Sequence, residues 1–134
     1  MSLYVDSSAL VKLYLEERDS EAAAQLLAAD EAWITARHAQ VEVRRTLART
    51  LSGAALRGAR EQFDRDWRGV DIVELTADVC DAAADIAETT GARTLDALHL
   101  GAARAVGGGI LPIVTFDLRQ AQTARSLGWT VLGS

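Results

Sequence analysis

Two aspartates stand where a carboxylate could take part in chemistry. Asp6 directly follows the apolar run at residues 3–5, and Asp117 directly follows the apolar run that ends at residue 116. If both runs are strands of an open α/β sheet, the carboxylates lie where such sheets bind ligands, beyond the carboxyl ends of the strands. Neighbouring strands would bring the two carboxylates into one cleft, and a bound divalent cation usually compensates such repulsion between them. Each aspartate also precedes a helical pattern, so capping of a helix N-terminus remains an alternative for both.

Two further acids lie in predicted helices, in apolar surroundings. Glu42 stands at the edge of the apolar stripe of its helix, between two valines. For Glu42, a solvated side chain that pairs with Arg45 or Thr46 one turn later remains an alternative. Asp96 lies in the mostly apolar turn at residues 94–100, where a carboxylate costs free energy unless it has a partner or faces a cleft. A favourable interaction with the helix dipole remains an alternative for Asp96.

The two histidines and the single cysteine receive simpler interpretations. His99 shares a helix face with Asp96, and we expect a packed, hydrogen-bonded histidine rather than a metal ligand. His38 has no partners in the sequence pattern and is expected at the surface. Cys80 has no second cysteine for a disulfide or a Cys-rich zinc site, and its position within a helix predicts a small core residue.

The elements that would position these residues alternate between short apolar runs and longer helical patterns. We predict strands at residues 3–5, 33–35, 72–73, 110–116 and 129–132. We predict one helix that begins near residue 9 and further helices at 22–29, 37–51, 54–68, 77–90, 95–106 and 118–127. The residues expected to cap the last three of these helices are Thr76, Thr94 and Asp117. Strands without polar alternation, separated by helices of about 10–15 residues, indicate a parallel sheet covered on both faces. The predicted class is therefore a three-layer α/β/α fold with a central parallel sheet of four to five strands.

The composition is that of an ordinary globular protein. The chain has 134 residues, of which 49% are hydrophobic and 25% charged, which excludes a disordered or fibrous protein and predicts one domain over residues 1–134. The N-terminus lacks the basic segment of a signal peptide. The longest uncharged run of the second half, residues 105–116, is shorter than the roughly 20 apolar residues of a membrane span. We therefore expect a cytoplasmic protein without a membrane partner.

The charges are unevenly distributed along the chain. The net charge of −5 argues at first against a nucleic-acid coat protein. Residues 37–68, however, hold eight arginines and only four acids, so this part is locally basic. Two solvated, ion-paired helices are one interpretation of this segment. A basic rim that holds the phosphates of a nucleic acid beside the carboxylates is the other, and its binding would weaken steeply with salt.

Four ordered sequence blocks cover nearly the whole chain. They are YVDSSALVKL, VEVRR, DALHL and VTFD, which begin at residues 4, 41, 96 and 114. Together they resemble the PIN-domain ribonucleases, and most closely the VapC-type toxins of bacterial toxin–antitoxin pairs. In similar proteins these blocks carry an acidic quartet, which matches Asp6, Glu42, Asp96 and Asp117. Many relatives have a serine six residues before the helical acid, where this chain has Ala36 with Thr35 beside it, so one minor hydrogen bond is in doubt.

The resemblance implies a PIN-like fold and a metal-dependent endoribonuclease. Mg²⁺ or Mn²⁺, which prefer oxygen ligands, would be the cofactor. Asp6 and Asp96 are expected to bind the ion directly, and Asp117 directly or through water. Glu42 would position or deprotonate the attacking water.

The substrate and the partners also follow from the resemblance. Ser7 and Thr115 match hydroxyls that accompany the acids, and we expect them to contact RNA together with Arg44 and Arg45. The expected partners are an RNA substrate, a cognate VapB-type antitoxin and a second copy of the chain in a homodimer. The alternative is a PIN-like module without catalytic activity, whose acids only cap helices and whose role is binding or assembly.

Overall fold

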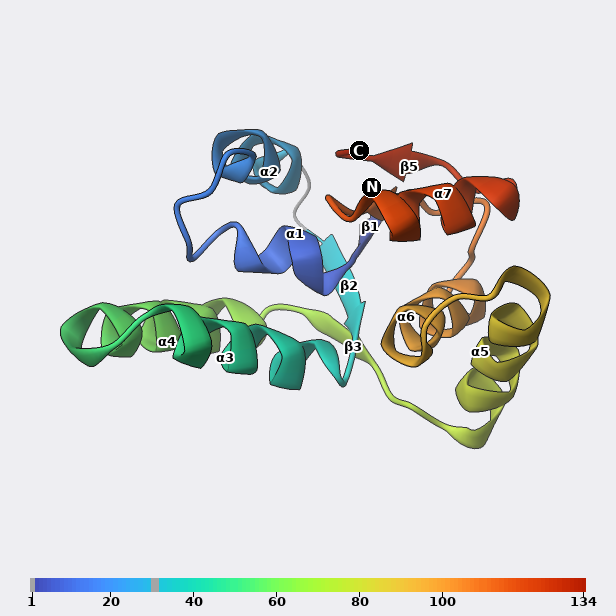
Figure 1. The fold of residues 1–134 in the computed structure, drawn as a ribbon, viewed down its shortest axis with the longest axis horizontal. Coiled ribbons are helices and arrows are strands. Elements are labelled where there is room, and N and C mark those ends of the chain that lie inside the picture. Colours follow the sequence, from blue (N-terminus) through green and yellow to red (C-terminus); the bar gives the residue numbers. More distant parts are fainter. Residues whose placement is uncertain (1, 30–31) are drawn as a thin grey trace.

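The computed structural model describes residues 2–29 and 32–134, which form an α/β fold (Figure 1). In chain order the described elements are β1 (Ser2–Val5), α1 (Ser7–Val11), α2 (Ser20–Ala28), β2 (Ala32–Ala36), α3 (Ala39–Thr50), α4 (Gly53–Trp67), β3 (Asp71–Val73), α5 (Ala77–Thr90), α6 (Thr94–Ala105), β4 (Ile113–Val114), α7 (Leu118–Ser126) and β5 (Val131–Leu132).

The described strands form one sheet of five, and every neighbouring pair is parallel. The strand order is β3-β2-β1-β4-β5, so the first strand lies at the centre. Tyr4 of β1 is aligned with Ile34 of β2 on one side and with Ile113 of β4 on the other. The chain runs from β1 outward to β3 and then returns to β4 on the opposite side of β1. Ligands bind at such a switch point in open α/β sheets, beyond the carboxyl ends of the strands.

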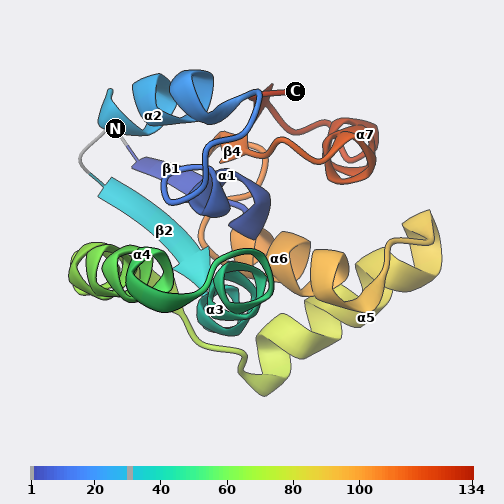
Figure 2. The same ribbon diagram turned by 60° about the vertical axis from the view of Figure 1, so that its left-hand side comes forward.

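The two faces of β1 contribute to two separate hydrophobic cores. Leu3 and Val5 face the helices α1 to α4, whereas Tyr4, between them, faces α5, α6 and α7. Helices α3 and α4 lie side by side in the first of these layers (Figures 1 and 2). Because β1 is buried on both faces, it is apolar at each of these three positions, as expected for a central parallel strand. The predicted three-layer α/β/α class is confirmed.

Helices α5 and α6 pack against each other at very short range. A Cβ atom added to Gly101 of α6 would lie only 2.8 Å from the backbone nitrogen of Ala83 and the carbonyl oxygen of Val79. Residue 101 must therefore lack a side chain, and the α5 residue opposite it, Ala83, must be small. This contact holds the N-terminal half of α6, which carries Asp96 and His99, in a defined position.

Several boundaries and burials differ from the sequence predictions. The first helix begins at Ser7 rather than near residue 9. The predicted strand 110–116 forms its ladder only at Ile113–Val114, because residues 107–111 form a turn closed by the Leu111 N–H to Gly107 C=O hydrogen bond. Thr94 is the first residue of α6 rather than its cap. Cys80 was predicted in the core but is exposed, because Val79, Ala83 and Ile86 form the buried face of α5. Among the described residues, no helix has both the length and the apolar composition of a membrane span.

Candidate active site

A cleft of about 310 Å³ lies at the carboxyl ends of the central strands. Its walls come from the residues after β1 and from α3, α6 and α7. We call it the carboxylate cleft, and its lining residues are Asp6, Ser7, Ser8, Val11, Lys12, Glu17, Glu42, Thr46, Asp96 and Asp117. All four acids that the sequence analysis singled out therefore share one cavity.

Asp6 is held in the cleft by hydroxyl groups. Its carboxylate oxygen Oδ2 accepts hydrogen bonds from Ser8 Oγ at 2.7 Å and from Thr115 Oγ1 at 2.8 Å. Asp6 stands at the N-cap position of α1, but within residues 2–29 its side chain makes no capping hydrogen bond. The capping alternative is therefore wrong for the side chain of Asp6, which is 3% exposed and bonded to neighbours inside the cleft.

Asp117 caps α7 and also lines the cleft. Its Oδ1 accepts hydrogen bonds from the backbone N–H groups of Arg119 at 2.8 Å and Gln120 at 3.2 Å. The capping interpretation is thus confirmed for Asp117. The two roles are compatible because a carboxylate has two oxygens, and the cap fixes the direction in which the group faces the cleft.

Asp96 shows the electrostatic cost of this arrangement. It lies in the first turn of α6, and burial together with the carboxylates of Asp6 and Asp117 raises its pKa to about 6. A carboxylic acid titrates this high when its charged form lacks a compensating partner. A cation in the cleft would supply that compensation.

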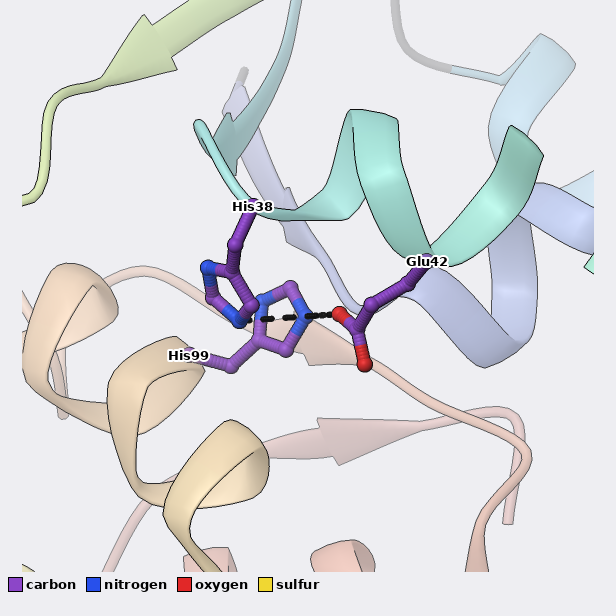
Figure 3. Close-up of side chains that lie close together, drawn as sticks. All are labelled: His38, Glu42 and His99. Carbon is purple, nitrogen blue, oxygen red and sulfur yellow. Dashed lines mark hydrogen bonds and ion pairs between the residues drawn. The ribbon is translucent and has the colours of Figure 1, made fainter. Parts of the chain in front are cut away.

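A chain of hydrogen bonds connects Glu42 to the core, and Figure 3 shows its first bond, between His99 and Glu42. His99 Nε2 lies 2.7 Å from Glu42 Oε1, and His99 Nδ1 lies 2.7 Å from the hydroxyl of Tyr4. His99 is fully buried and packs edge-on against the Tyr4 ring, so the expectation of a packed, hydrogen-bonded histidine is confirmed. The Glu42 carboxylate thus pairs with His99 and not with a residue one turn later. Thr46 Oγ1 donates its hydrogen bond to the backbone carbonyl of Glu42 instead.

Electrostatic attraction stabilises the charged forms of Glu42 and His99. Burial opposes the charge on both groups, but their hydrogen bond and mutual attraction outweigh it. The pKa of Glu42 is therefore lowered. The pKa of His99 is raised against the effect of its burial, first by the charge of Asp6 and then by the hydrogen bond and charge of Glu42. The imidazole thus holds the Glu42 carboxylate as an anion at the wall of the cleft.

His38 is not at the surface, as the sequence analysis expected, but 9% exposed. Its ring lies against that of His99 at a centroid distance of 4.1 Å, and its Nε2 is 3.1 Å from the Leu95 carbonyl oxygen. Burial and the neighbouring charge of His99 lower the pKa of His38. His38 is the N-cap residue of α3 and precedes Glu42 by four residues, so the helical repeat places both on one face. That spacing is the signal that could have found it.

The arginines predicted to hold RNA lie outside the carboxylate cleft. Arg44 and Arg45 line a separate hollow of about 370 Å³, which we call the arginine groove; its lining residues are Gln40, Val41, Arg44, Arg45, Ala48 and Arg60. A third cavity, lined by Arg93 and Arg119, shares Asp96 as a lining residue with the carboxylate cleft. The sequence analysis missed these two arginines, although each stands within three residues of a quartet acid.

The cleft has the donor set that a hard divalent cation requires. Five of its lining side chains are carboxylates, and the single lysine, Lys12, forms an ion pair with Glu17 at 3.8 Å. The carboxylates lie close enough together to raise the pKa of Asp96. Such a group of oxygen donors fits Mg²⁺ or Mn²⁺, which prefer oxygen ligands.

Comparison with known proteins places the chain in a family. The model of the PIN domain family matches residues 3–126. The chain belongs to the PIN-domain family. This PIN domain is 34% identical to the ribonuclease VapC45 of Mycobacterium tuberculosis (strain CDC 1551 / Oshkosh), over 96% of this chain and 93% of that protein. With such relatives it is a VapC-type ribonuclease, as the four sequence blocks indicated.

Solved structures show the same fold at lower sequence identity. Mycobacterium tuberculosis VapC20, described as a sarcin–ricin loop cleaving toxin, has a TM-score of 0.76 at 21% identity, with 96% of each chain covered. A toxin–antitoxin complex from Klebsiella pneumoniae has a TM-score of 0.67 at 15% identity, with 86% of each chain covered.

Proposed function

We propose that residues 1–134 act as one PIN domain that cleaves RNA internally with Mg²⁺ or Mn²⁺ as cofactor, and that this ribonuclease is the toxin of a toxin–antitoxin pair. The observation that carries the proposal is the convergence of all four predicted acids on one cleft. The name of the relative VapC45, a ribonuclease, supports RNA as the substrate. Because RNA is the substrate, we place the activity in the cytoplasm.

Three aspartates are proposed to hold the ion. Asp6 and Asp96 would bind it directly, and Asp117 would do so directly or through water. When bound, the ion would neutralise charge on the phosphodiester and lower the pKa of a water molecule. Thr115 is fully buried and donates to Asp6, so it has no surface for contact with RNA, and we assign it the role of orienting Asp6.

Glu42 is proposed to orient the attacking water. Its lowered pKa makes it a weak base, so a hydrogen bond to the water suits it better than removal of the proton. The bond from His99 fixes the Glu42 carboxylate before substrate arrives, which avoids the cost of ordering it during the reaction.

RNA would be held on both sides of the cleft. Ser7 lines the cleft itself and can donate to the phosphodiester. Arg44 and Arg45 would hold more distant phosphates from the arginine groove. Arg93 and Arg119 are positioned for phosphates closer to Asp96.

The partners are proposed from the resemblance and one neighbour. The Klebsiella pneumoniae structure is a toxin–antitoxin complex, which supports a VapB-type antitoxin as the partner of this chain. A homodimer is proposed from the resemblance alone.

The test is cleavage of a structured, end-labelled RNA by the purified chain. We expect internal cuts with Mn²⁺, no cuts with a chelator, and no cuts by Asp96→Asn. Asp85→Asn, the same change at an exposed position of α5, is the matched control and should cleave as wild type does. Cleavage by Asp96→Asn at the wild-type rate would contradict the assignment of Asp96 to the active site. No cleavage by the wild type would support the non-catalytic binding module instead.

A further inference from the structure

Three side chains at the wall of the carboxylate cleft form a cluster that contains nitrogen ligands (Figure 3). In the described part of the chain, His38, Glu42 and His99 offer ligand atoms that all lie within 4.8 Å of one another. His38 Nε2 is 3.5 Å from Glu42 Oε1, and His99 Nε2 is 2.7 Å from the same oxygen. Asp6 Oδ1 lies 3.5 Å from His99 Nε2 and could serve as a fourth ligand.

We propose that His38, Glu42 and His99 form a second metal site, which binds Zn²⁺ or another late transition metal ion rather than Mg²⁺. Two imidazoles and a carboxylate are a donor set that suits zinc, whereas Mg²⁺ prefers oxygen and keeps its waters. Zinc–ligand bonds of about 2.1 Å separate tetrahedral ligands by about 3.4 Å. The separation of His38 Nε2 and Glu42 Oε1 matches this value, as does that of His99 Nε2 and Asp6 Oδ1, both at 3.5 Å. The His99–Glu42 contact of 2.7 Å must open by several tenths of an ångström.

The surroundings of the two imidazoles fit metal binding. The Tyr4 hydroxyl at 2.7 Å can accept a hydrogen bond from His99 Nδ1–H, the kind of second contact that fixes a ligating histidine. His38 Nδ1 is buried and has no hydrogen-bond partner among the residues that the structure describes. His38 Nε2 instead faces the Leu95 carbonyl at 3.1 Å and Glu42 Oε1 at 3.5 Å, and a metal bond at this nitrogen would replace the contact with Leu95.

The site would regulate the enzyme, a consequence that rests on the proposed function. Glu42 belongs both to this cluster and to the carboxylate cleft. A transition metal on its Oε1 would turn the carboxylate away from the attacking water and lower the rate of RNA cleavage. The ribonuclease would then be inhibited by zinc while magnesium remains in place.

The binding test uses tag-free protein, because the chain has only two histidines and both lie in the cluster. A Cys80→Ser background removes the exposed thiol as a competing ligand. Titration with Co²⁺, read by its visible absorption and reversed by Zn²⁺, should show one site of tetrahedral character. His38→Gln should weaken Co²⁺ binding at least about tenfold, whereas Asp117→Asn, which alters only the oxygen ligands, should leave it unchanged.

Two results would overturn the metal site. One is Co²⁺ binding that His38→Gln leaves unchanged, and the other is binding that Asp117→Asn removes. The wild-type chain gives an independent measurement if His38→Gln does not fold. Zn²⁺, but not Mg²⁺, should shift the ring-proton resonances of both histidines, and unmoved resonances would contradict the site.

The regulatory consequence has a separate readout. The Zn²⁺ concentration that halves Mg²⁺-dependent cleavage should rise at least about tenfold in His38→Gln, with each variant compared with its own rate without zinc. Zinc that binds to the cluster without slowing cleavage would overturn the regulatory role. If the chain cleaves no RNA at all, the proposed function fails, and the Co²⁺ titration still decides the metal site.

Discussion

The carboxylate cleft is assembled from elements far apart in the sequence, whereas the arginine groove is built from two consecutive helices. Glu42 and His99, which are hydrogen-bonded across the cleft wall, are 57 residues apart. Arg44, Arg45 and Arg60, by contrast, belong to α3 and α4, which follow each other in the chain. Hydrogen bonds from neighbouring elements fix the side chains of the cleft. The arginines of the groove are positioned by the helices that carry them.

This difference matches two kinds of task. Chemistry at a phosphodiester needs oxygens held in a defined geometry, because the rate depends on small displacements of the reacting groups. Attraction of a polyanion needs only positive charge at the right distance, since phosphate contacts are electrostatic and tolerant of geometry. Changes in the cleft should therefore affect the rate of cleavage, and changes in the groove should affect the binding of RNA.

The largest effect is expected from Asp6→Asn. The amide removes one charge from the proposed metal ligands and disturbs the hydroxyls of Ser8 and Thr115 that donate to Asp6. We expect kcat to fall on the order of 100-fold or more, with RNA affinity nearly unchanged in a binding assay. A variant that loses affinity but keeps kcat would break the division between cleft and groove.

The next largest effect is the pH dependence of metal binding, measured by titration with Mn²⁺. In the folded chain the pKa of Asp96 is raised to about 6, so a proton competes with the ion below that pH. Mn²⁺ affinity should therefore rise about tenfold between pH 5 and pH 7 and then level off.

The raised pKa of Asp96 also has a consequence for stability. Without metal, the favourable contribution of the neutral Asp96 to folding is lost as pH rises through about 6, because the unfolded chain gives up that proton more readily. Asp96→Asn should flatten both pH profiles, and a Mn²⁺ affinity that does not change with pH in the wild type would contradict the assignment.

A smaller effect is expected from Tyr4→Phe. The change removes the hydroxyl at His99 Nδ1 and loosens the imidazole that orients Glu42. We expect about 1 kcal/mol of lost stability and a few-fold lower kcat. Tyr14→Phe is the matched control, since the Tyr14 hydroxyl also makes a side-chain hydrogen bond, which it donates to Asp66, but Tyr14 does not line the cleft. Equal losses of kcat in both variants would show a general effect of stability.

The smallest effect on the chemistry is expected from Arg44→Gln combined with Arg45→Gln. KM for RNA should rise a few-fold, the dependence of binding on salt should become shallower by about two ions, and kcat should stay unchanged. Arg104→Gln, at the far end of α6 from Asp96, is the control and should change none of these. An unchanged salt dependence in the double variant would move the RNA path to the cavity of Arg93 and Arg119.

The strands, the helices and the four acids were largely predictable from local patterns. Hydrophobic periodicity and cap residues depend on neighbours in the sequence, and they identified the central strand at Leu3–Val5 and the cap at Asp117. The exposure of Cys80 and the short ladder of β4 were missed, because they depend on which helix face meets a partner and where a turn closes. Thr115 was predicted to contact RNA, yet the sheet buries it against Asp6.

The sequence by itself therefore determined the fold class, the family blocks and the four carboxylates, because these features depend only on residue types and their short spacings. Only the tertiary structure decided how those carboxylates are held. It brought the rings of His38 and His99 together beside Glu42, and it separated Arg44 and Arg45 from the cleft. The physical reason is that hydrogen bonds and charges act over a few ångströms in space. Residues that make these contacts lie far apart in the sequence, so a short sequence pattern cannot predict which of them meet.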